Sequence, residues 1–439
     1  MDPSKIREKI GRFRILVIGR ANAGKTTILQ RVCNTRENPE IFNSAGEKRG
    51  EHDIENEMVF ESNPGFIFHD SRGFEAGGES EFNKVKAFIT SRSKEVKLKN
   101  QLHAIWYCIP MDEASRSFTE GEISFFSQCD TGSIPVIVLF TKFDALYDLA
   151  YSELKSKGAS MEEAKKLAPK HAEESFAKGS QLKFLYHSKD IRRPPKCHVC
   201  LPNMDNDDAN CGPLIERTAG TLNSEVLTQL FVSTQQTNLE LCMKHAVKKT
   251  LHDVFDSAET PASKYHQGMI RKLASWFPHI DLLYLNDREE MQSRILAVGS
   301  GSSPLENIVQ LSSGESGGCV ALNLLIIDHL AAVIIFEHSF YIYDKQRHRQ
   351  DQKKSAPSFN VALELYMASP HAAAVRETVR AAIQEYEEAM RAPVHTYEGN
   401  LPAWMAKLLF ECSEEKKQKS MAKARLIKTV LEITLEHRL

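Results

Sequence analysis

An apolar run near the start of the chain, Arg14-Ile-Leu-Val-Ile-Gly19, leads directly into Gly19-Arg-Ala-Asn-Ala-Gly24-Lys25-Thr26. A short, continuous apolar run bounded by glycine is typical of a strand buried on both faces of a sheet. The residues that follow, Thr27-Ile-Leu-Gln-Arg-Val, favour a helix. We therefore expect the chain to open with a buried strand, a glycine-rich turn and a helix.

Similar apolar runs recur along the first half of the chain. They occupy residues 65–70, 102–109, 135–140 and 196–201, and residues 58–62 add a candidate edge strand. Charged stretches with helical spacing lie between them, at 79–94 and 119–128. Strands that alternate with helices predict an α/β fold with a mostly parallel sheet and helices on both faces.

The second half has few strand signals, so the length of 439 residues favours two domains. We predict an α/β domain over residues 1–235 and an α-helical domain over 236–439.

Residues 151–178, rich in Lys, Glu and Ala, indicate a solvated helical insertion in the first domain. One helix is expected from residue 213 to 247, and the segments 299–318 and 346–358 are typical of a loop and a polar linker. Ser369-Pro370 should begin a further helix, whose predicted apolar face is Val375, Val379, Ala382, Ile383, Tyr386 and Met390.

The overall composition matches that of a soluble protein. Hydrophobic residues make up 42% and charged residues 26%, and 56 basic against 58 acidic side chains leave a net charge of −2. No nucleic-acid partner is expected, because the chain lacks a basic excess. Nine scattered cysteines favour a reducing compartment, and the N-terminus does not resemble a signal peptide, so we expect a cytoplasmic protein.

The glycine-rich turn matches the pattern G-x-x-x-x-G-K-[ST], which binds phosphates when it lies between a strand and a helix. Gly19 and Gly24 let the backbone curl around phosphate oxygens, and the amides of Ala23 to Thr27 at the helix start point toward them. Lys25 would neutralise charge on the β- and γ-phosphates, and the Thr26 hydroxyl would hold Mg²⁺.

Two further motifs follow later strands. Asp70-Ser-Arg-Gly73 fits D-x-x-G, in which the aspartate reaches the Mg²⁺ shell and the glycine N–H senses a γ-phosphate. Thr141-Lys142-Phe-Asp144 ends the run at 135–140. Asp144 can accept hydrogen bonds from guanine N1–H and its amine, which adenine does not offer, while the stem of Lys142 packs over the base. Each motif is weak alone, but three in order at successive strand ends form one nucleotide site at the carboxyl edge of the sheet.

These motifs resemble the G domain of the translation-factor-related (TRAFAC) class of P-loop GTPases, over about residues 12–235. Gly19-Arg-Ala-Asn-Ala-Gly24-Lys25-Thr26-Thr27 is most similar to the Era-like and septin-like branches, and Ile67-Phe-His-Asp70-Ser-Arg-Gly73 with the residues after it is similar to fungal G-domain-containing proteins. The resemblance implies binding of GTP, GDP and Mg²⁺, nucleotide-dependent switching and slow GTP hydrolysis. It makes Lys25, Asp70 and Gly73 the catalytic candidates.

The pattern departs from that class at three places. Phe74 follows Gly73, where Ras-like enzymes have a glutamine that orients water. No threonine lies between Thr35 and Thr90, so Ser44 is our candidate Mg²⁺ contact, against an ordinary loop serine. The base-contacting S-A-K loop is also missing after the last strand, where residues 201–204 or the Asp-rich turn behind them are expected instead.

Asn22 carries a separate hypothesis. Members that resemble the chain at this position use the asparagine to hold a monovalent cation, K⁺, beside the phosphates. The alternative is an asparagine that stabilises its own turn.

Three other features have more than one interpretation. Cys197, Cys200 and Cys211 could suggest zinc, but buried structural thiols are favoured because the pair has no partner pair at metal spacing. Residues 320–340 are very apolar, yet Asp328-His329 at the centre favours a buried helix over a membrane span. The basic residues of 416–428, with an apolar stripe of Ile427, Val430, Leu431 and Leu435, fit either a bundle helix or a helix lying on anionic lipid.

The functional alternatives therefore remain a GTP-hydrolysing switch that acts through its helical domain, a hydrolytically silent GTP-bound scaffold, and a membrane-associated large GTPase. Homodimer formation through the G domain stays open as well. An ATPase is disfavoured, because Asp144 offers adenine no partner.

Overall fold

The structure is a computed structural model. It describes residues 3–43, 45–48, 53–71, 79–112, 118–206, 209, 211–256, 272–277, 326–327, 330–342, 358–391 and 414–437. The chain divides into two compact units, residues 3–238 and 239–439. The boundary predicted at 235/236 lies three residues before this division.

The first unit is built on one seven-stranded sheet with the order β2-β3-β4-β1-β5-β6-β7. The strands are β1 (Phe13–Gly19), β2 (Glu40–Phe42), β3 (Glu57–Phe60), β4 (Asn63–Asp70), β5 (Ala104–Pro110), β6 (Val136–Thr141) and β7 (Cys197–Leu201). β4, β1, β5, β6 and β7 pair in parallel, whereas β2 and β3 are antiparallel to their neighbours. The predicted α/β fold with a mostly parallel sheet is confirmed, and only the three-residue strand β2 had no counterpart in the prediction.

The register brings the ends of the parallel strands to one edge. Val17 pairs with Asp70, and Gly19 pairs with Cys108. Thr141 pairs with Pro110 on one side and with Leu201 on the other. The glycine-rich turn, Asp70 and the Thr141 motif therefore all lie at the carboxyl edge of the sheet.

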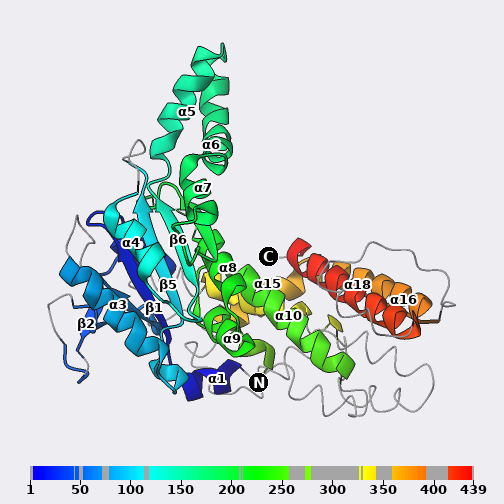
Figure 1. Cartoon of the computed structure of the whole chain (residues 1–439). Coiled ribbons are helices and arrows are strands. Elements are labelled where there is room, and N and C mark those ends of the chain that lie inside the picture. The colour runs from blue at the N-terminus through cyan, green and yellow to red at the C-terminus, as the bar shows by residue number, and fades with distance from the viewer. Residues whose placement is uncertain are drawn as a thin grey trace. The chain divides into compact units, whose positions relative to one another are not determined.

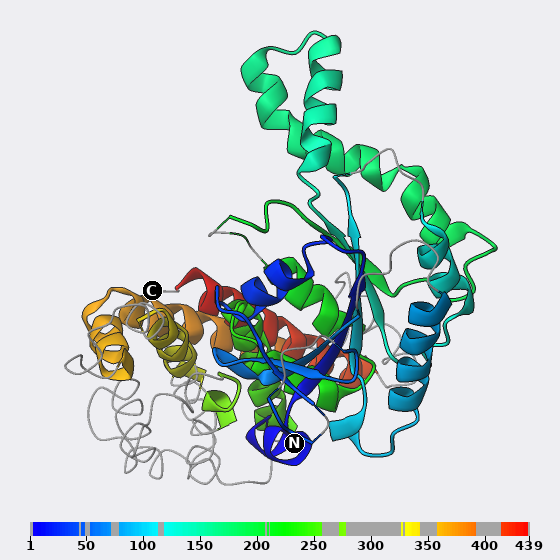
Figure 2. The same ribbon diagram turned by 90° about the vertical axis from the view of Figure 1, so that its left-hand side faces the viewer.

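Helices cover both faces of this sheet (Figure 2). One face is covered by α3 (Glu79–Ser93), α4 (Glu120–Gln128) and α7 (Ser180–His187), and the other by α2 (Lys25–Val32), α8 (Gly212–Thr221) and α9 (Glu225–Thr234). α1 (Pro3–Ile10) packs against α9. On the α8 side the indole N–H of Trp106 donates to Thr218 Oγ1 at 3.1 Å, so the buried nitrogen is satisfied.

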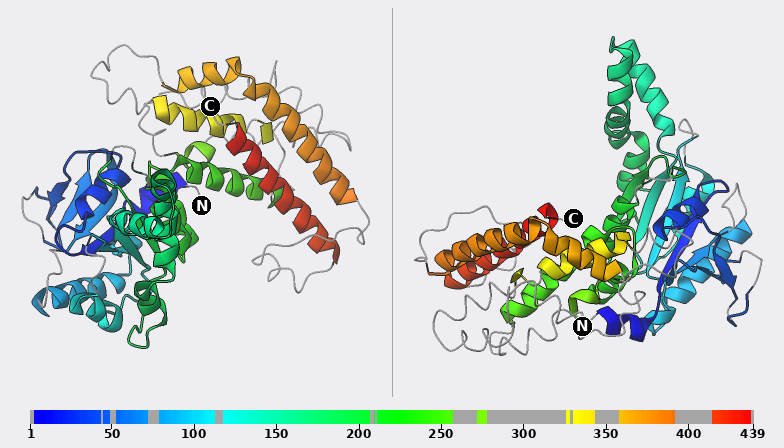
Figure 3. Two further views of the ribbon diagram at one scale, coloured as in Figure 1. Left: turned by 90° about the horizontal axis from the view of Figure 1, so that it is seen from above. Right: turned by 180° about the vertical axis from the view of Figure 1, so that it is seen from behind.

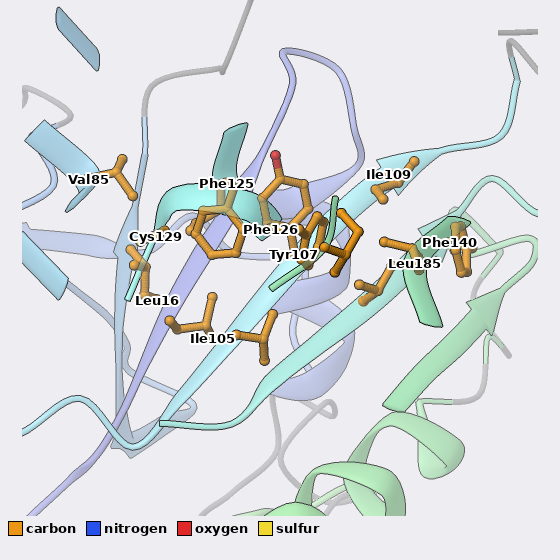
Figure 4. Close-up of a cluster of buried hydrophobic side chains, with 14 of the residues drawn as sticks. Leu16, Val85, Ile105, Tyr107, Ile109, Phe125, Phe126, Cys129, Phe140 and Leu185 are labelled. Atoms are coloured by element: carbon orange, nitrogen blue, oxygen red, sulfur yellow. The ribbon is translucent and has the colours of Figure 1, made fainter. Parts of the chain in front are cut away.

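A core cluster lies between β1, β5 and β6 and the helices α3, α4 and α7. Figure 4 shows how Tyr107, Phe125 and Phe126 pack together at its centre, with ring centroids 4.8 to 5.2 Å apart. Its members include Leu16, Val85, Ile105, Ile109, Phe140 and Leu185. Alternate residues of the strands fill this face, as the pleat of a doubly covered sheet requires.

A helical arm interrupts the sheet between β6 and β7. α5 (Ala145–Ser156) and α6 (Met161–Ala177) form an antiparallel hairpin that extends beyond the sheet in Figure 1. Small side chains let the helices approach, since Ala150, Ala168 and Ala172 are buried between them. Ser160 and Glu163 form a capping box that starts α6. The helical insertion predicted at 151–178 is present, but it begins at Ala145.

The helix predicted from residue 213 to 247 is wrong as a single element. Three helices occupy this range: α8, α9 and α10 (Leu239–Asp256). Leu222 leaves the helical region with ψ 124°, and Ser224 precedes α9 in an extended conformation. At the second break the Gln235 side chain accepts hydrogen bonds from the backbone N–H groups of Thr237 and Asn238, which ends one helix before the next begins.

The second unit is helical in the part that the structure describes. Besides α10, it contains α15 (Ser358–Ala368), α16 (His371–Arg391), α18 (Glu414–Glu436) and a helical segment at 330–342. Figure 3 shows α16 and α18 side by side. The predicted face of α16 is buried at Val375, Val379, Ala382 and Ile383, while Tyr386 is half-buried and the side chain of Met390 lies outside the described residues.

The two stretches with a membrane interpretation pack within this unit where they are described. Residues 330–336 are buried in a helix, and α18 buries Leu426, Ile427 and Val430. In the described ranges, no helix combines the length and apolar character needed to cross a bilayer. The segments predicted as a loop, 299–318, and as a linker, 346–358, lie outside the described residues except for Ser358, which begins α15.

Candidate functional site

The glycine-rich turn joins β1 to α2 as predicted. Gly24 has φ 75° and ψ 15°, a left-handed conformation, and directly precedes Lys25, the first residue of α2. Asn22 is also left-handed, with φ 59°. The first N–H groups of a helix have no partner within it, so the start of α2 presents amide donors and a positive dipole end to an anion.

Lys25 reaches back across this turn. Its Nζ donates to the carbonyl oxygens of Gly19 and Arg20, both at 3.1 Å, and lies 3.8 Å from Asp70 Oδ1. The lysine at the helix start and the aspartate at the end of β4 are therefore neighbours, although 45 residues separate them (70 − 25). The two predicted phosphate-side residues occupy one site.

The donors around Lys25 suit a magnesium ion. The Thr26 side chain is exposed at the start of α2, and the carboxylate of Asp70 lies 3.8 Å from Lys25, the residue before Thr26. Mg²⁺ is usually held by one or two protein oxygens together with waters and phosphate oxygens. The site thus fits an ion that arrives with a phosphate ligand, with Thr26 and Asp70 as its protein contacts.

Gly19 fits against β5 with no room for a side chain. A Cβ at this position would lie 2.7 Å from the carbonyl oxygen and 2.9 Å from the Cβ of Cys108. Burial raises the pKa of the Cys108 thiol to about 12, so it stays protonated beneath the turn. Ala23 is buried on the same turn, while Thr27 is half-buried. Close packing of the turn on β5 therefore requires a glycine at this position.

The Thr141-Lys142-Phe-Asp144 motif, predicted to read the base, starts at the last residue of β6. Asp144 precedes α5 directly, and its Oδ1 accepts a 2.7 Å hydrogen bond from the backbone N–H of Asn203. Asn203 follows β7 and is left-handed, with φ 51°. Residues 201–204 thus lie next to Asp144, where the sequence predicted a loop to replace the missing S-A-K motif.

Thr141 and Lys142 complete this side of the site. The Thr141 side chain is 1% exposed, and its Oγ1 has no hydrogen-bond partner in the described part of the chain. Lys142 is left-handed, with φ 51°, and its Nζ pairs with Asp112 at the end of β5. About 40% of each side chain in this pair is exposed, so the pair contributes at most about 1 kcal/mol of stability.

Two residues that hold the site together were missed by the sequence analysis. Arg31 of α2 donates to the carbonyl oxygens of Met204 and Asp205, at 3.0 and 2.9 Å. Glu122 of α4 pairs with Arg20 of the glycine-rich turn at 2.9 Å. Thr119-x-x-Glu122 is recognisable as a capping box, but no local pattern could reveal a partner about a hundred residues away.

Some predicted site residues are not placed. Ser44, the candidate Mg²⁺ contact, and Gly73, the candidate γ-phosphate sensor, lie outside the described residues, as do Phe74 and the rest of 72–78. The left-handed φ of Asn22 is what the turn interpretation requires. The K⁺ hypothesis for this residue stays a prediction.

In the described part of the chain, Cys197, Cys200 and Cys211 belong to no group of side chains that could hold a metal ion. Cys197, Cys200 and Cys211 are free thiols. Across the described ranges, no three His, Cys, Asp or Glu side chains gather as a metal-binding group. Burial raises the pKa of Cys200 and of Cys211 to about 12, so both thiols stay protonated at neutral pH.

The described fold is a mostly parallel α/β sheet with a glycine-rich turn after the central strand β1 and an aspartate, Asp144, just after β6. No protein-family model and no curated protein matches the chain. Among solved structures, the GDP-bound S. thermophilus NFeoB point mutant is 14% identical, with 73% of this chain and 99% of that chain covered and a TM-score of 0.27. A bacterial dynamin pair, described as oligomerised and as sensing and tethering membranes, is 10% identical over 99% of this chain and 86% of that chain, with a TM-score of 0.26. Similarities this weak add nothing to the chemistry of the site, which rests on the contacts above.

Proposed function

We propose that the chain binds GTP and GDP at the carboxyl edge of the sheet and hydrolyses GTP slowly in the presence of Mg²⁺. The observation that carries this proposal is the joining of the three motifs at that edge. Lys25 Nζ lies 3.8 Å from Asp70 Oδ1, and Asp144 lies on the same edge, directly before α5. Phosphate recognition and base recognition can therefore act on one molecule.

Guanine is favoured over adenine by the chemistry of Asp144. Its carboxylate can accept from N1–H and from the exocyclic amine of guanine, and the Asn203 N–H already holds its Oδ1 in place. Adenine presents an acceptor at N1, so a carboxylate there would face a lone pair without a hydrogen bond. Because adenine lacks the N1–H donor, ATP should bind more weakly than GTP.

Hydrolysis would transfer the γ-phosphoryl group to water and release GDP and phosphate. The contribution of the protein is positional and electrostatic: Lys25 and the amides of the turn face the phosphate oxygens, and Mg²⁺, when bound, neutralises part of their charge. No covalent intermediate is required. The helical unit would respond to the nucleotide state, which is the usual output of a switch.

The test is a titration of the whole protein with GTP, GDP and ATP, each with and without Mg²⁺, followed by phosphate release at high protein concentration. We expect tight binding of both guanine nucleotides, weak binding of ATP and slow release of phosphate. Lys25→Ala should abolish tight binding, because it removes the cation that faces the β- and γ-phosphates. Equal affinity for ATP and GTP would contradict the proposal.

Binding without release of phosphate would instead favour the silent scaffold. Co-sedimentation with anionic liposomes, with and without residues 415–439, tests the membrane-associated alternative. The soluble switch predicts that the protein stays in the supernatant in both cases.

A further inference from the structure

The glycine-rich turn is tied to α4 by a buried ion pair. Arg20, the residue after Gly19, contacts Glu122 Oε1 through Nε and Nη2, each at 2.9 Å. The two side chains are 12% and 2% exposed. An ion pair so shielded from water restrains its partners far more than a surface pair does.

Glu122 is also held from the other side. Its Oε2 accepts the backbone N–H of Thr119 at 2.8 Å, and its own N–H donates to Thr119 Oγ1 at 3.3 Å. The carboxylate therefore has one oxygen on the cap of α4 and the other on the turn. Its position is fixed by the helix, and the position of Arg20 follows from it.

The backbone of Arg20 belongs to the phosphate-binding machinery. Its carbonyl oxygen accepts from Lys25 Nζ at 3.1 Å and from the Ala23 N–H at 3.3 Å. A displacement of Arg20 would move the acceptor that orients the Lys25 ammonium and would open the turn. It would also leave Glu122 buried with one partner fewer, which is strongly unfavourable.

We infer that Glu122 is a positioning residue of the phosphate site, which holds the Gly19–Thr26 turn in its binding conformation through Arg20. The inference rests on the proposed function and assigns α4 a part in it. A turn that is already ordered lowers the entropic cost of binding a phosphate ligand. Loss of the ion pair between Arg20 and Glu122 should therefore weaken nucleotide binding, although it removes no group that touches the nucleotide.

The test compares Glu122→Gln with Thr119→Ala in the full-length protein. The amide of the first variant keeps a single oxygen for the N–H groups of Arg20 and Thr119, and it loses the charge. The Kd for GDP and GTP should therefore rise about 10-fold, which corresponds to about 1.4 kcal/mol. GMP should lose less than about 2-fold, because it lacks the β- and γ-phosphates that the turn holds. Thr119→Ala removes part of the helix cap but leaves the pair with Arg20, so it should lower the melting temperature and leave both Kd values unchanged.

A double variant separates positioning from folding. Arg20→Met combined with Glu122→Gln replaces the ion pair by a neutral pair that keeps the capping oxygen, and we expect a melting temperature near that of the wild type with the same 10-fold rise in Kd for GDP. Wild-type affinity for GDP in Glu122→Gln or in the double variant would overturn the positioning role, and so would an equal loss for GMP and GDP. Neither result would affect GTP binding by the wild type. A wild-type chain that binds no guanine nucleotide would overturn the proposed function and this inference together.

Discussion

The backbone N–H of Asn203 donates a 2.7 Å hydrogen bond to Asp144 Oδ1, across 59 residues of sequence. This bond joins the loop after β7 to the start of α5, and it engages one of the two carboxylate oxygens of Asp144. The helical arm lies between the two residues in the sequence, so the chain leaves the site at Asp144 and returns to it at Asn203.

Replacement of Asp144 should change the base preference. In Asp144→Asn the amide oxygen can still accept the Asn203 N–H, but the amide nitrogen now donates where guanine also donates. We expect GTP affinity to fall about 100-fold and XTP to bind more tightly than GTP, since the oxo group of xanthine accepts that donor. Competition titrations with both nucleotides measure this. Asp148→Asn, which removes an exposed carboxylate one turn along α5, is the matched control and should leave both affinities unchanged.

Removal of Arg31 should loosen the loop after β7. Arg31→Met keeps most of the side-chain volume but deletes the charge-assisted bonds to Met204 and Asp205. Because that loop positions Asp144 through Asn203, we expect the Kd for GTP to rise about 10-fold, as loss of about 1.4 kcal/mol would produce. Isothermal titration with GTP would check this. Arg36→Met, at an exposed position just after α2, serves as the control. Equal Kd values for the two variants would show that the bonds from Arg31 to Met204 and Asp205 do not affect GTP binding.

A methyl group at Gly19 should destabilise the first unit. In Gly19→Ala the new Cβ would lie 2.7 Å from the backbone oxygen of Cys108, and backbone cannot rotate away as a side chain can. Overpacking of this kind costs about 1–3 kcal/mol. Urea unfolding followed by tryptophan fluorescence measures it. Gly220→Ala, in α8, meets nothing within 4 Å and should be neutral or slightly stabilising, so an equal loss in the two variants would contradict the steric argument.

Acid should destabilise the sheet through His69. Burial, followed by the charges of Arg14 and Arg92, lowers the pKa of this histidine from 6.5 to about 3 in the folded state. The unfolded chain therefore takes up a proton below pH 6.5 that the folded chain does not, so stability is complete above pH 6.5 and is lost as pH falls. The loss between pH 7 and pH 5 should be about 2 kcal/mol for this group.

His69→Gln tests that assignment. The amide can replace the contact that His69 Nδ1 makes with Ile54 O at 2.9 Å, and it does not titrate. Urea unfolding at pH 7, 6 and 5 should show a shallower pH dependence for this variant than for the wild type. Identical slopes would mean that the proton uptake occurs elsewhere.

The strands were predictable because burial on both faces leaves a continuous apolar run, and each such run of the first unit became a parallel strand. β2 escaped prediction because Glu40–Phe42 is short and partly exposed, so its pattern differs little from that of a loop. The breaks between α8, α9 and α10 escaped because they depend on side-chain caps such as Gln235, whose residue type is common inside helices.

The residues of the candidate site also fall into a predictable and an unpredictable group. The proposed contacts to phosphate and base follow strand ends at fixed spacing, so local motifs were enough to bring Lys25, Asp70 and Asp144 to one edge of the sheet. Arg31 and Glu122 act on partners 173 and 102 residues away, and an arginine or glutamate on a helix is otherwise a common surface residue. Only the folded sheet brings such pairs together.

The helical arm of α5 and α6 begins directly after Asp144, the carboxylate that we propose reads guanine. α5 begins with Ala145, the residue after Asp144, and its twelve residues extend about 18 Å from that point. Since Asn203 is bonded to the same carboxylate, the arm both starts and ends its excursion beside Asp144. A contact that displaces the start of α5 would therefore displace Asp144, and under the proposed function it would weaken the hold on guanine.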